Sequence, residues 1–439
     1  LPATDIKCWL KRMEPTQIYT STKDAYWQTD ALLDCDCPYC GGLQSAPTDH
    51  EWKGFGGCFN EIGWDALGKL SPAKRDELLD LLFAPDADGC RFTYNRLPIG
   101  ASDFALSWYS LNETPGDLAM EHFSIARDEA CLIPYIKEGL RQQPKMRLFA
   151  SPWSPPTWMK FPMAHNFGNL IETEENLQAY ALYFARFLRA YREAGIDINA
   201  LHVQNEPAVS QKFPSCKYTG ELLRKLITDY IVPHFKTCGE PAEVWLGTIN
   251  SDAYNEYFAP VLGAPEALKA IAGVGLQWNG KHALPLLRQT HPDLPVIQTE
   301  NECGDGQNTW DYARYVFNLA RHYINNGVEA YVYWNFVLYD GGDSTWGWKQ
   351  NSLFTIGRDG KGYTIQPEFY IMKHLARFVP VGARPLRLSG AWSAHSIGFL
   401  TPEGRTVLIT ENPHPEAASV TYQDETYGLP PESITTLVL

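Results

Sequence analysis

The chain of 439 residues lacks a long apolar run, and no stretch reaches the roughly 18 residues that a membrane span needs. It also lacks a basic run, and its formal net charge is −14. We therefore expect no membrane span, and neither nucleic acid nor an anionic membrane surface as partner. The start, Leu1 to Thr4, has no basic segment before an apolar one, so no signal peptide is expected, although a processed chain begins in the same way. The chain should be soluble, and a secreted or periplasmic location is slightly favoured over the cytoplasm. The oligomeric state stays open.

Groups that would hold a metal are missing as well. His122, His202 and His374 are scattered along the sequence without a second ligand at metal spacing, so we interpret them as core residues or as residues that support the site from behind. We expect no metal and no organic cofactor. Cys58 and Cys303 lie beside candidate site residues and are expected to be small buried apolar side chains rather than nucleophiles.

Cysteine itself is not scarce, since ten are present. Cys37 and Cys40 have the C-x-x-C spacing of thiol oxidoreductases, but no compact βαβ unit surrounds them. With Cys8 and Cys35 nearby, a zinc site, a disulfide cluster and free thiols all remain open. The pairing of these cysteines cannot be assigned from the sequence.

Aromatic residues are abundant. Fourteen Trp, 23 Tyr and 20 Phe make up 13% of the chain. Aromatic faces stack on sugar rings, so an acidic, aromatic-rich chain suits a carbohydrate site, although a large core would have the same composition.

Strand and helix patterns alternate over most of the chain. Between about residues 51 and 355 this alternation predicts a (β/α)₈ TIM barrel of the α/β class. After residue 355 the pattern changes to turn-punctuated alternation, as at 396–409, which predicts β-hairpins. We expect residues 356–439 to form a side β-sandwich that is completed by strands of an N-terminal arm, residues 1–50.

Two of the expected barrel strands end on a carboxylate. The apolar stretch 198–203 runs into Asn205, Glu206 and Pro207, and the proline ends the strand because it has no backbone N–H. A second apolar strand ends at Glu300. The carboxyl ends of barrel strands carry the chemistry of this fold, and a pair of acids there is what glycoside hydrolysis requires. With 51 acids in the chain, however, two solvated surface carboxylates are an equally simple interpretation.

A set of motifs narrows the choice. The segment 202–207, His-Val-Gln-Asn-Glu-Pro, resembles the acid/base strand of the retaining glycosidases built on (β/α)₈ barrels. More narrowly, the chain resembles glycoside hydrolase family 30, the glucosylceramidase-like enzymes, and the match runs in family order from about residue 54 to 380. The other matching stretches are Gly54 to Gly57, Ser151 to Lys160, Thr299-Glu300, Tyr333 to Asn335, and Pro367 to His374.

The resemblance implies a double displacement. Glu300 would attack the anomeric carbon, while Glu206 would first protonate the leaving oxygen and then deprotonate water. Arg96 would keep Glu300 ionised. The rival nucleophile is Glu302, and Glu300 is favoured because it directly follows the apolar run.

The resemblance also implies a set of substrate-binding residues. Asn205 would meet the hydroxyl beside the anomeric carbon, and Trp153 and Trp334 would supply walls. The remaining candidates are Glu61, Asn335, Trp278, Asn279 and Arg96. Glucosylceramidases carry an aspartate in place of Glu61 and a tyrosine in place of Asn279, which puts glucosylceramide itself in doubt.

The expected function is a retaining β-glycosidase for β-linked glucosides or related sugars. Long loops at 207–219 and 303–310 would wall off one end of the cleft, which favours exo action. The alternatives are an endo-β-1,6-glucanase, or a β-xylosidase, β-fucosidase or β-glucuronidase on the same scaffold. From other classes, a non-catalytic carbohydrate-binding barrel and a thiol oxidoreductase using Cys37 and Cys40 remain as rivals.

Overall fold

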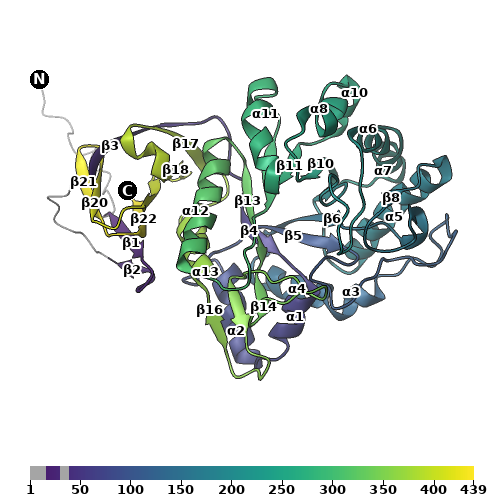
Figure 1. The fold of residues 1–439 in the computed structure, drawn as a ribbon, viewed down its shortest axis with the longest axis horizontal. Helices are drawn as coiled ribbons and strands as arrows, with labels where there is room; N and C mark the ends of the chain where they lie inside the picture. Colours follow the sequence, from purple (N-terminus) through teal and green to yellow (C-terminus); the bar gives the residue numbers. More distant parts are fainter. Residues whose placement is uncertain (1–15, 30–38) are drawn as a thin grey trace, which may run out of the picture.

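The computed structural model describes residues 16–29 and 39–439, and most of them form a closed barrel (Figure 1). Eight parallel strands close in the order β10-β11-β12-β13-β4-β5-β6-β9. The predicted (β/α)₈ barrel is confirmed. The strands are β4 (Gly54–Cys58), β5 (Tyr94–Ile99), β6 (Arg147–Pro152), β9 (Ala200–His202), β10 (Glu243–Ile249), β11 (Val274–Gln277), β12 (Val296–Glu300) and β13 (Ala330–Asn335).

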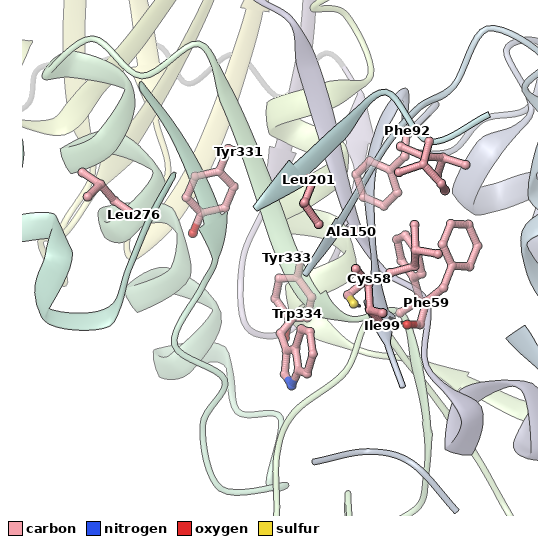
Figure 2. Close-up of a cluster of buried hydrophobic side chains, with 14 of the residues drawn as sticks. Cys58, Phe59, Phe92, Ile99, Ala150, Leu201, Leu276, Tyr331, Tyr333 and Trp334 are labelled. Carbon is pink, nitrogen blue, oxygen red and sulfur yellow. Dashed lines mark hydrogen bonds between the residues drawn. The ribbon is translucent and has the colours of Figure 1, made fainter. Parts of the chain in front are cut away.

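Large side chains fill the inside of the barrel. Tyr94, Phe149, Trp245 and Ile297 come from four different strands and are almost fully buried in one cluster. Further buried residues pack around the strands, as Figure 2 shows. The barrel is therefore a packed core without a channel, and its chemistry must lie at the strand ends.

Helices follow the strands, and several begin at a side chain that caps their free N–H groups. Thr173, Thr219 and Thr309 each accept a hydrogen bond from the backbone three residues on, which satisfies a donor that the first turn leaves unpaired. The helices are α1 (Glu61–Leu67), α2 (Pro72–Phe83), α3 (Ala126–Ala130), α4 (Leu132–Gln142), α5 (Glu174–Glu193), α6 (Gly220–Lys225), α7 (Val232–Cys238), α8 (Tyr254–Tyr257), α9 (Ala259–Leu262), α10 (Pro265–Ala270), α11 (Leu284–Thr290), α12 (Trp310–Asn325) and α13 (Pro367–Ala376).

One helical region runs further than its sequence predicts. The pattern predicts a helix that stops at Ile231, before Pro233. Instead, Leu226–Ile231 form a π-helical stretch that leads into α7, in whose first turn Pro233 lies. Because the backbone is helical on both sides of the junction, Pro233 lies inside a continuous helical run, directly after the irregular π-helical turn.

Two small sheets lie in segments that follow barrel strands at the C-terminal end of the barrel. One contains β14 (Val337–Tyr339), β15 (Phe354–Ile356) and β16 (Tyr363–Ile365), and the other pairs β7 (Lys160–Phe161) with β8 (Asn169–Leu170). They belong to the segments that follow β13 and β6, so they shape the surroundings of the strand ends.

A nine-stranded sheet curls beside the barrel (Figure 1). Its strands β1 and β3 come from the N-terminal region and pair with β22 and with β17 and β20 respectively, which confirms the side β-sandwich built from both ends of the chain. The strands are β1 (Gln17–Ser21), β2 (Gln28–Thr29), β3 (Tyr39–Pro47), β17 (Arg384–Ser389), β18 (Ser396–Leu400), β19 (Thr406–Asn412), β20 (Ala418–Tyr422), β21 (Glu425–Leu429) and β22 (Ser433–Val438).

Helices α12 and α13 join the barrel to this sheet. His374 of α13 is fully buried, and its two ring nitrogens lie 2.8 Å and 2.9 Å from the hydroxyls of Thr436 and Ser21. Arg314 of α12 donates a 2.9 Å hydrogen bond from Nε to Glu411 of β19. These contacts are polar but mostly buried, so they fix how the two parts sit together.

Some of the sequence-based expectations fall on residues without a described structure. Cys8, Cys35 and Cys37 lie outside the described residues, so neither a disulfide, a zinc site nor a redox pair is tested. Cys40 lies at an exposed position in β3. Among the described residues, no helix is both long and apolar enough to cross a membrane.

The Arg314–Glu411 pair gives a stability prediction. Arg314→Ala leaves Glu411, 4% exposed at its side chain, without its main counter-charge, so the free energy of unfolding should fall by about 3 kcal/mol. Arg141→Ala is the matched control, because Arg141 pairs with Glu138 and Asp76 on the surface and should cost under about 1 kcal/mol. Urea unfolding measures both, and equal losses would contradict a structural role for the buried pair.

Candidate active site

The end of β9 turns Glu206 toward the mouth of the barrel. The Gln204 N–H donates to the carbonyl of Gly247, the Thr248 N–H donates to the carbonyl of Gln204, and the Glu206 N–H donates to the carbonyl of Thr248. Glu206 itself has a φ of +50°, in the left-handed region that glutamate rarely adopts. Its backbone is therefore held in an uncommon conformation at the point where it leaves the barrel. Such conformations gather at functional sites.

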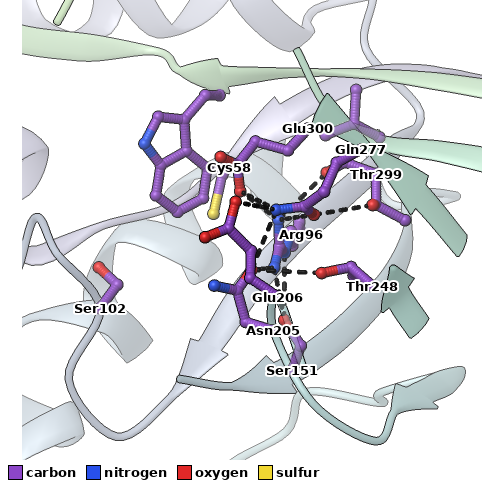
Figure 3. Close-up of polar contacts among 12 residues, drawn as sticks. Cys58, Arg96, Ser102, Ser151, Asn205, Glu206, Thr248, Gln277, Thr299 and Glu300 are labelled. Carbon is purple, nitrogen blue, oxygen red and sulfur yellow. Dashed lines mark hydrogen bonds and ion pairs between the residues drawn. The ribbon is translucent and has the colours of Figure 1, made fainter. Parts of the chain in front are cut away.

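Arg96 of β5 is the centre of the site and is completely buried (Figure 3). It donates 2.7 Å hydrogen bonds from Nη1 to Glu300 and from Nη2 to the side-chain oxygen of Asn205. Ser151 accepts from both Nε and Nη2, and the carbonyl of Thr299 lies 3.3 Å from Nη1. A buried guanidinium needs a negative partner, and Glu300 supplies it.

Gln277, at the end of β11, contacts both glutamates. Its Nε2 lies 3.2 Å from Oε1 of Glu206 and 3.1 Å from Oε2 of Glu300. Its Oε1 accepts from Thr299 Oγ1 at 3.0 Å and lies 3.3 Å from Arg96 Nη1, which fixes which way the amide faces. Both carboxylates therefore converge on one amide nitrogen.

That shared nitrogen limits the distance between the two acids. Their contacting oxygens can be no more than about 6 Å apart, which suits a retaining pair, whose carboxyl groups lie about 5 Å apart, better than the wider spacing of most inverting pairs. A direct attack on the anomeric carbon is therefore favoured over activation of a water between the acids.

The surroundings of the two acids differ. Burial raises the pKa of Glu300, but Arg96 and the donors of Trp278 and Gln277 oppose this by stabilising the carboxylate. Burial and the charge of Glu300 raise the pKa of Glu206, whose one side-chain donor among the described residues is Gln277. Glu206 is also the more exposed of the two. Of the pair, the surroundings of Glu206 therefore favour the protonated form, and those of Glu300 favour the carboxylate.

Asn205 presents its nitrogen to the open side. Its Oδ1 accepts from Arg96, from Thr248 Oγ1 at 3.2 Å and from Gln277 at 3.2 Å. Because the oxygen is occupied, the amide orientation is fixed, and Nδ2 is the group left to donate to a ligand. Figure 3 shows this nitrogen pointing away from Arg96.

Three tryptophans surround the acids. Trp153 and Trp334 stack with ring centroids 5.3 Å apart, and the Arg96 guanidinium lies 4.5 Å and 5.4 Å from their centroids. The buried Nε1 of Trp334 has no partner among the described residues, and Figure 2 shows it pointing away from the packed cluster. Trp278 donates 3.1 Å from Nε1 to Glu300. These rings form apolar walls with one spare donor.

Three of the predicted substrate-binding residues either form hydrogen bonds and ion pairs within the protein or make no hydrogen bond to the two acids. Glu61 forms an ion pair with Arg127 at 2.8 Å and accepts from the backbone of Leu106. Asn335 donates to Gln350 and accepts from Asn60, which caps α1. Both side chains are buried in protein contacts, so we leave them out of the proposed sugar-binding set. Asn279 is exposed beyond Trp278, with no hydrogen bond to the acids.

The geometry also separates Glu300 from its rival. Glu302 pairs with Lys281 at 2.5 Å and accepts from the Tyr315 hydroxyl at 2.6 Å, whereas Glu300 faces Arg96. Cys303 and Cys58 are buried, and burial raises the pKa of both thiols, so both stay protonated and unreactive. Among the described residues there is no group of three or more His, Cys, Asp or Glu that could hold a metal ion.

Two residues of the site escaped the sequence analysis. Gln277 ends an apolar strand in the same way as Glu300, so the strand-end signal applies to it too. Asp103, just beyond β5, is 6% exposed, and its buried Oδ1 has no partner among the described residues. Burial, together with the charge of Glu300, raises the pKa of Asp103. Its unpartnered oxygen is free to contact a hydroxyl of a ligand.

A (β/α)₈ barrel that holds two neighbouring glutamates at the carboxyl ends of its strands has the arrangement that glycoside hydrolases use. The family model described as the glycosyl hydrolase family 30 TIM-barrel domain matches residues 52–379, so the chain belongs to this family of retaining glycosidases. The predicted resemblance is confirmed.

The chain is also similar to individual proteins and to a solved structure. Putative glucosylceramidase 3 of Caenorhabditis elegans is 26% identical, over 88% of this chain and 79% of the relative. An endo-1,6-beta-D-glucanase of Trichoderma harzianum is 25% identical, over 88% and 83%. The crystal structure of SrfJ from Salmonella typhimurium superposes with a TM-score of 0.87 at 25% identity, over 97% of this chain and 99% of the other.

The position of Gln277 predicts a change in pH dependence. Its N–H stabilises both carboxylates, so Gln277→Met should raise the pKa of Glu206 and of Glu300 and move both limbs of the kcat/KM profile to higher pH. Loss of hydrogen bonds to charged groups should also lower kcat/KM about 10- to 100-fold.

Gln298→Met is the control for this change. Gln298 is equally buried, but its side chain accepts from the backbone of Val332 and touches neither acid, so its profile should keep the wild-type limbs. Unshifted limbs in Gln277→Met would contradict the bridging role of Gln277.

Proposed function

We propose that the protein is an exo-acting, retaining β-glycosidase that cleaves β-linked glucosides. The observation that carries the proposal is the asymmetry of the acid pair: Arg96 lies 2.7 Å from Glu300, while Glu206, within reach of the same Gln277 nitrogen, pairs with no cation among the described residues. Nucleophile and proton donor are therefore both ready before the substrate enters.

The first step forms a glycosyl-enzyme. Glu300 attacks the anomeric carbon as the bond to the aglycone breaks, and the proton of Glu206 passes to the leaving oxygen. Once Glu300 is esterified, its negative charge is gone, and the pKa of the now ionised Glu206 falls. Asn205 Nδ2 donates to the hydroxyl beside the anomeric carbon in this state.

The second step reverses the roles. Glu206 takes a proton from water, the water oxygen attacks the anomeric carbon, and Glu300 leaves as the carboxylate that Arg96 stabilises. The sugar is released with its original configuration, and both glutamates return to their starting protonation states.

The depth of the site supports exo action on glucosides. Glu300 is 6% exposed and Asn205 3% exposed, so a terminal sugar reaches the anomeric position more readily than a residue inside a polymer. Trp153, Trp334 and Asp103 would then surround that terminal ring. The names of the two relatives described above, a glucosylceramidase and an endo-1,6-beta-D-glucanase, refer to glucosyl substrates. The Trichoderma relative makes endo-β-1,6-glucan cleavage the second candidate.

A panel of aryl β-glycosides with Glu300→Ala tests this proposal. The wild type should cleave the glucoside faster than the xyloside, galactoside, fucoside and glucuronide. Glu300→Ala should lose at least about 10⁴-fold in kcat, because no covalent intermediate can form. Azide should restore turnover and yield a glycosyl azide of inverted configuration.

Glu302→Ala is the matched control, since Glu302 is the neighbouring carboxylate with partners outside the site, and it should keep most of the activity. An active Glu300→Ala would refute the assigned nucleophile. A wild type that ignores every aryl glycoside but degrades β-1,6-glucan would replace exo action with the endo alternative.

A further inference from the structure

Two segments from opposite sides of the barrel meet through aromatic rings. Strands β9 and β13 are four places apart in the closed order of eight, so their ends face each other across the mouth. Phe213 lies in the segment after β9 and Trp346 in the segment between β14 and β15. Their ring centroids are 5.1 Å apart, and Trp346 stacks on Trp348 at 5.4 Å with 21° between the planes. We call Phe213, Trp346 and Trp348 the aromatic bridge.

One side of the aromatic bridge is a self-supported hairpin. The backbone of Ser344 donates to the Trp348 carbonyl at 2.8 Å, and the Trp348 N–H donates to the Ser344 hydroxyl at 3.0 Å. At the base, Gln350 donates to the carbonyl of Gly342 and accepts from Asn335, the neighbour of Trp334. The hairpin is thus anchored to the strand that carries a wall of the active site.

The other side is braced by a buried lysine. Lys160 has no exposed surface and donates from Nζ to the Ser154 hydroxyl and to the carbonyls of His165 and Ser215. Ser215 lies two residues beyond Phe213 in the same segment. Both supports of the bridge are therefore ordered before a ligand binds, which lowers the entropic cost of binding.

The exposed surface of the bridge suits a sugar ring. Trp348 is 42% exposed, and the Nε1 of Trp346 is a buried donor without a partner among the described residues. Beside the rings, Lys349 lies 4.0 Å from Asp343. A flat apolar face edged by charged groups matches a pyranose, which has apolar C–H faces and hydroxyls at its rim. An alkyl chain would gain nothing from the ion pair.

The bridge begins on the side of the leaving group. Phe213 belongs to the segment that starts at Glu206, and in the proposed mechanism Glu206 protonates the oxygen of the departing group. A sugar ring attached to that oxygen would extend from the anomeric carbon past Glu206, toward the segment that carries Phe213. Trp153 and Trp334, whose rings lie against Arg96, surround the ring that is attacked.

We propose that the aromatic bridge binds the first sugar ring on the leaving-group side, so that the substrates are β-linked gluco-oligosaccharides. This inference rests on the proposed glucosidase activity. Within that activity, the proposed aglycone is a second sugar, as opposed to a lipid or an aryl group.

Paired substrates with and without an aglycone ring test the bridge. In Trp348→Ala, kcat/KM for gentiobiose and cellobiose should fall about 10-fold through loss of stacking. For β-glucosyl fluoride, which has no leaving-group sugar, kcat/KM should stay within about twofold of the wild type. Trp348→Phe should recover most of the loss. Phe161→Ala, an exposed ring on the nearby β7 strand, is the matched control and should behave as wild type with both substrates.

The outcomes separate the two proposals. An equal loss with the fluoride and the disaccharides would show that Trp348 supports the catalytic floor, and the subsite would be refuted while the glucosidase stands. A loss confined to octyl β-glucoside would replace the sugar with an apolar aglycone and refute the subsite as well. A wild type inactive on β-glucosyl fluoride would refute the glucosidase proposal and the subsite with it.

Discussion

The contact on which this structure depends is the buried ion pair between Arg96 and Glu300. A guanidinium with no exposed surface is costly unless its donors are all used, and here Ser151, Asn205 and Gln277 come from three further strands to use them. The same set fixes the orientation of the Asn205 amide. The buried charge of Arg96 thereby positions the polar side chains at the carboxyl ends of the strands, and the reactivity of the site follows from their arrangement.

The charge on Glu300 also decides the state of its neighbour. Glu206 lies within hydrogen-bond reach of the same amide but pairs with no cation among the described residues, which favours its protonated form. Glu206 is partly exposed and can exchange that proton with water, whereas Glu300 is 6% exposed. The floor thus supplies the chemistry common to the family. The loops that follow the barrel strands carry the aromatic bridge. In the proposed mechanism their role is to contact the leaving group.

Local sequence patterns predicted the fold and placed two acids at strand ends, and the resemblance to glycoside hydrolase family 30 singled out these acids as the candidate pair. Apolar strands that stop at Glu206 and Glu300 are visible in a few residues, and so are the caps of the long helices. Side-chain partners from distant segments are not visible in this way. Glu61 is taken by Arg127 and Asn335 by Gln350, and only the fold shows it. Gln277 was overlooked although its strand-end signal is present, and the meeting of Phe213 with Trp346 has no local signal at all.

The most direct test of the central claim is to trap the intermediate. A 2-deoxy-2-fluoro-β-glucosyl fluoride carries a good leaving group but reacts slowly in the second step, so a covalent glycosyl-enzyme should accumulate. Proteolysis and mass spectrometry would then locate the sugar. We predict one label, on Glu300. In an Arg96→Met variant we predict no label, because the buried Glu300 would take up a proton. A label on Glu302, or full labelling without Arg96, would contradict it.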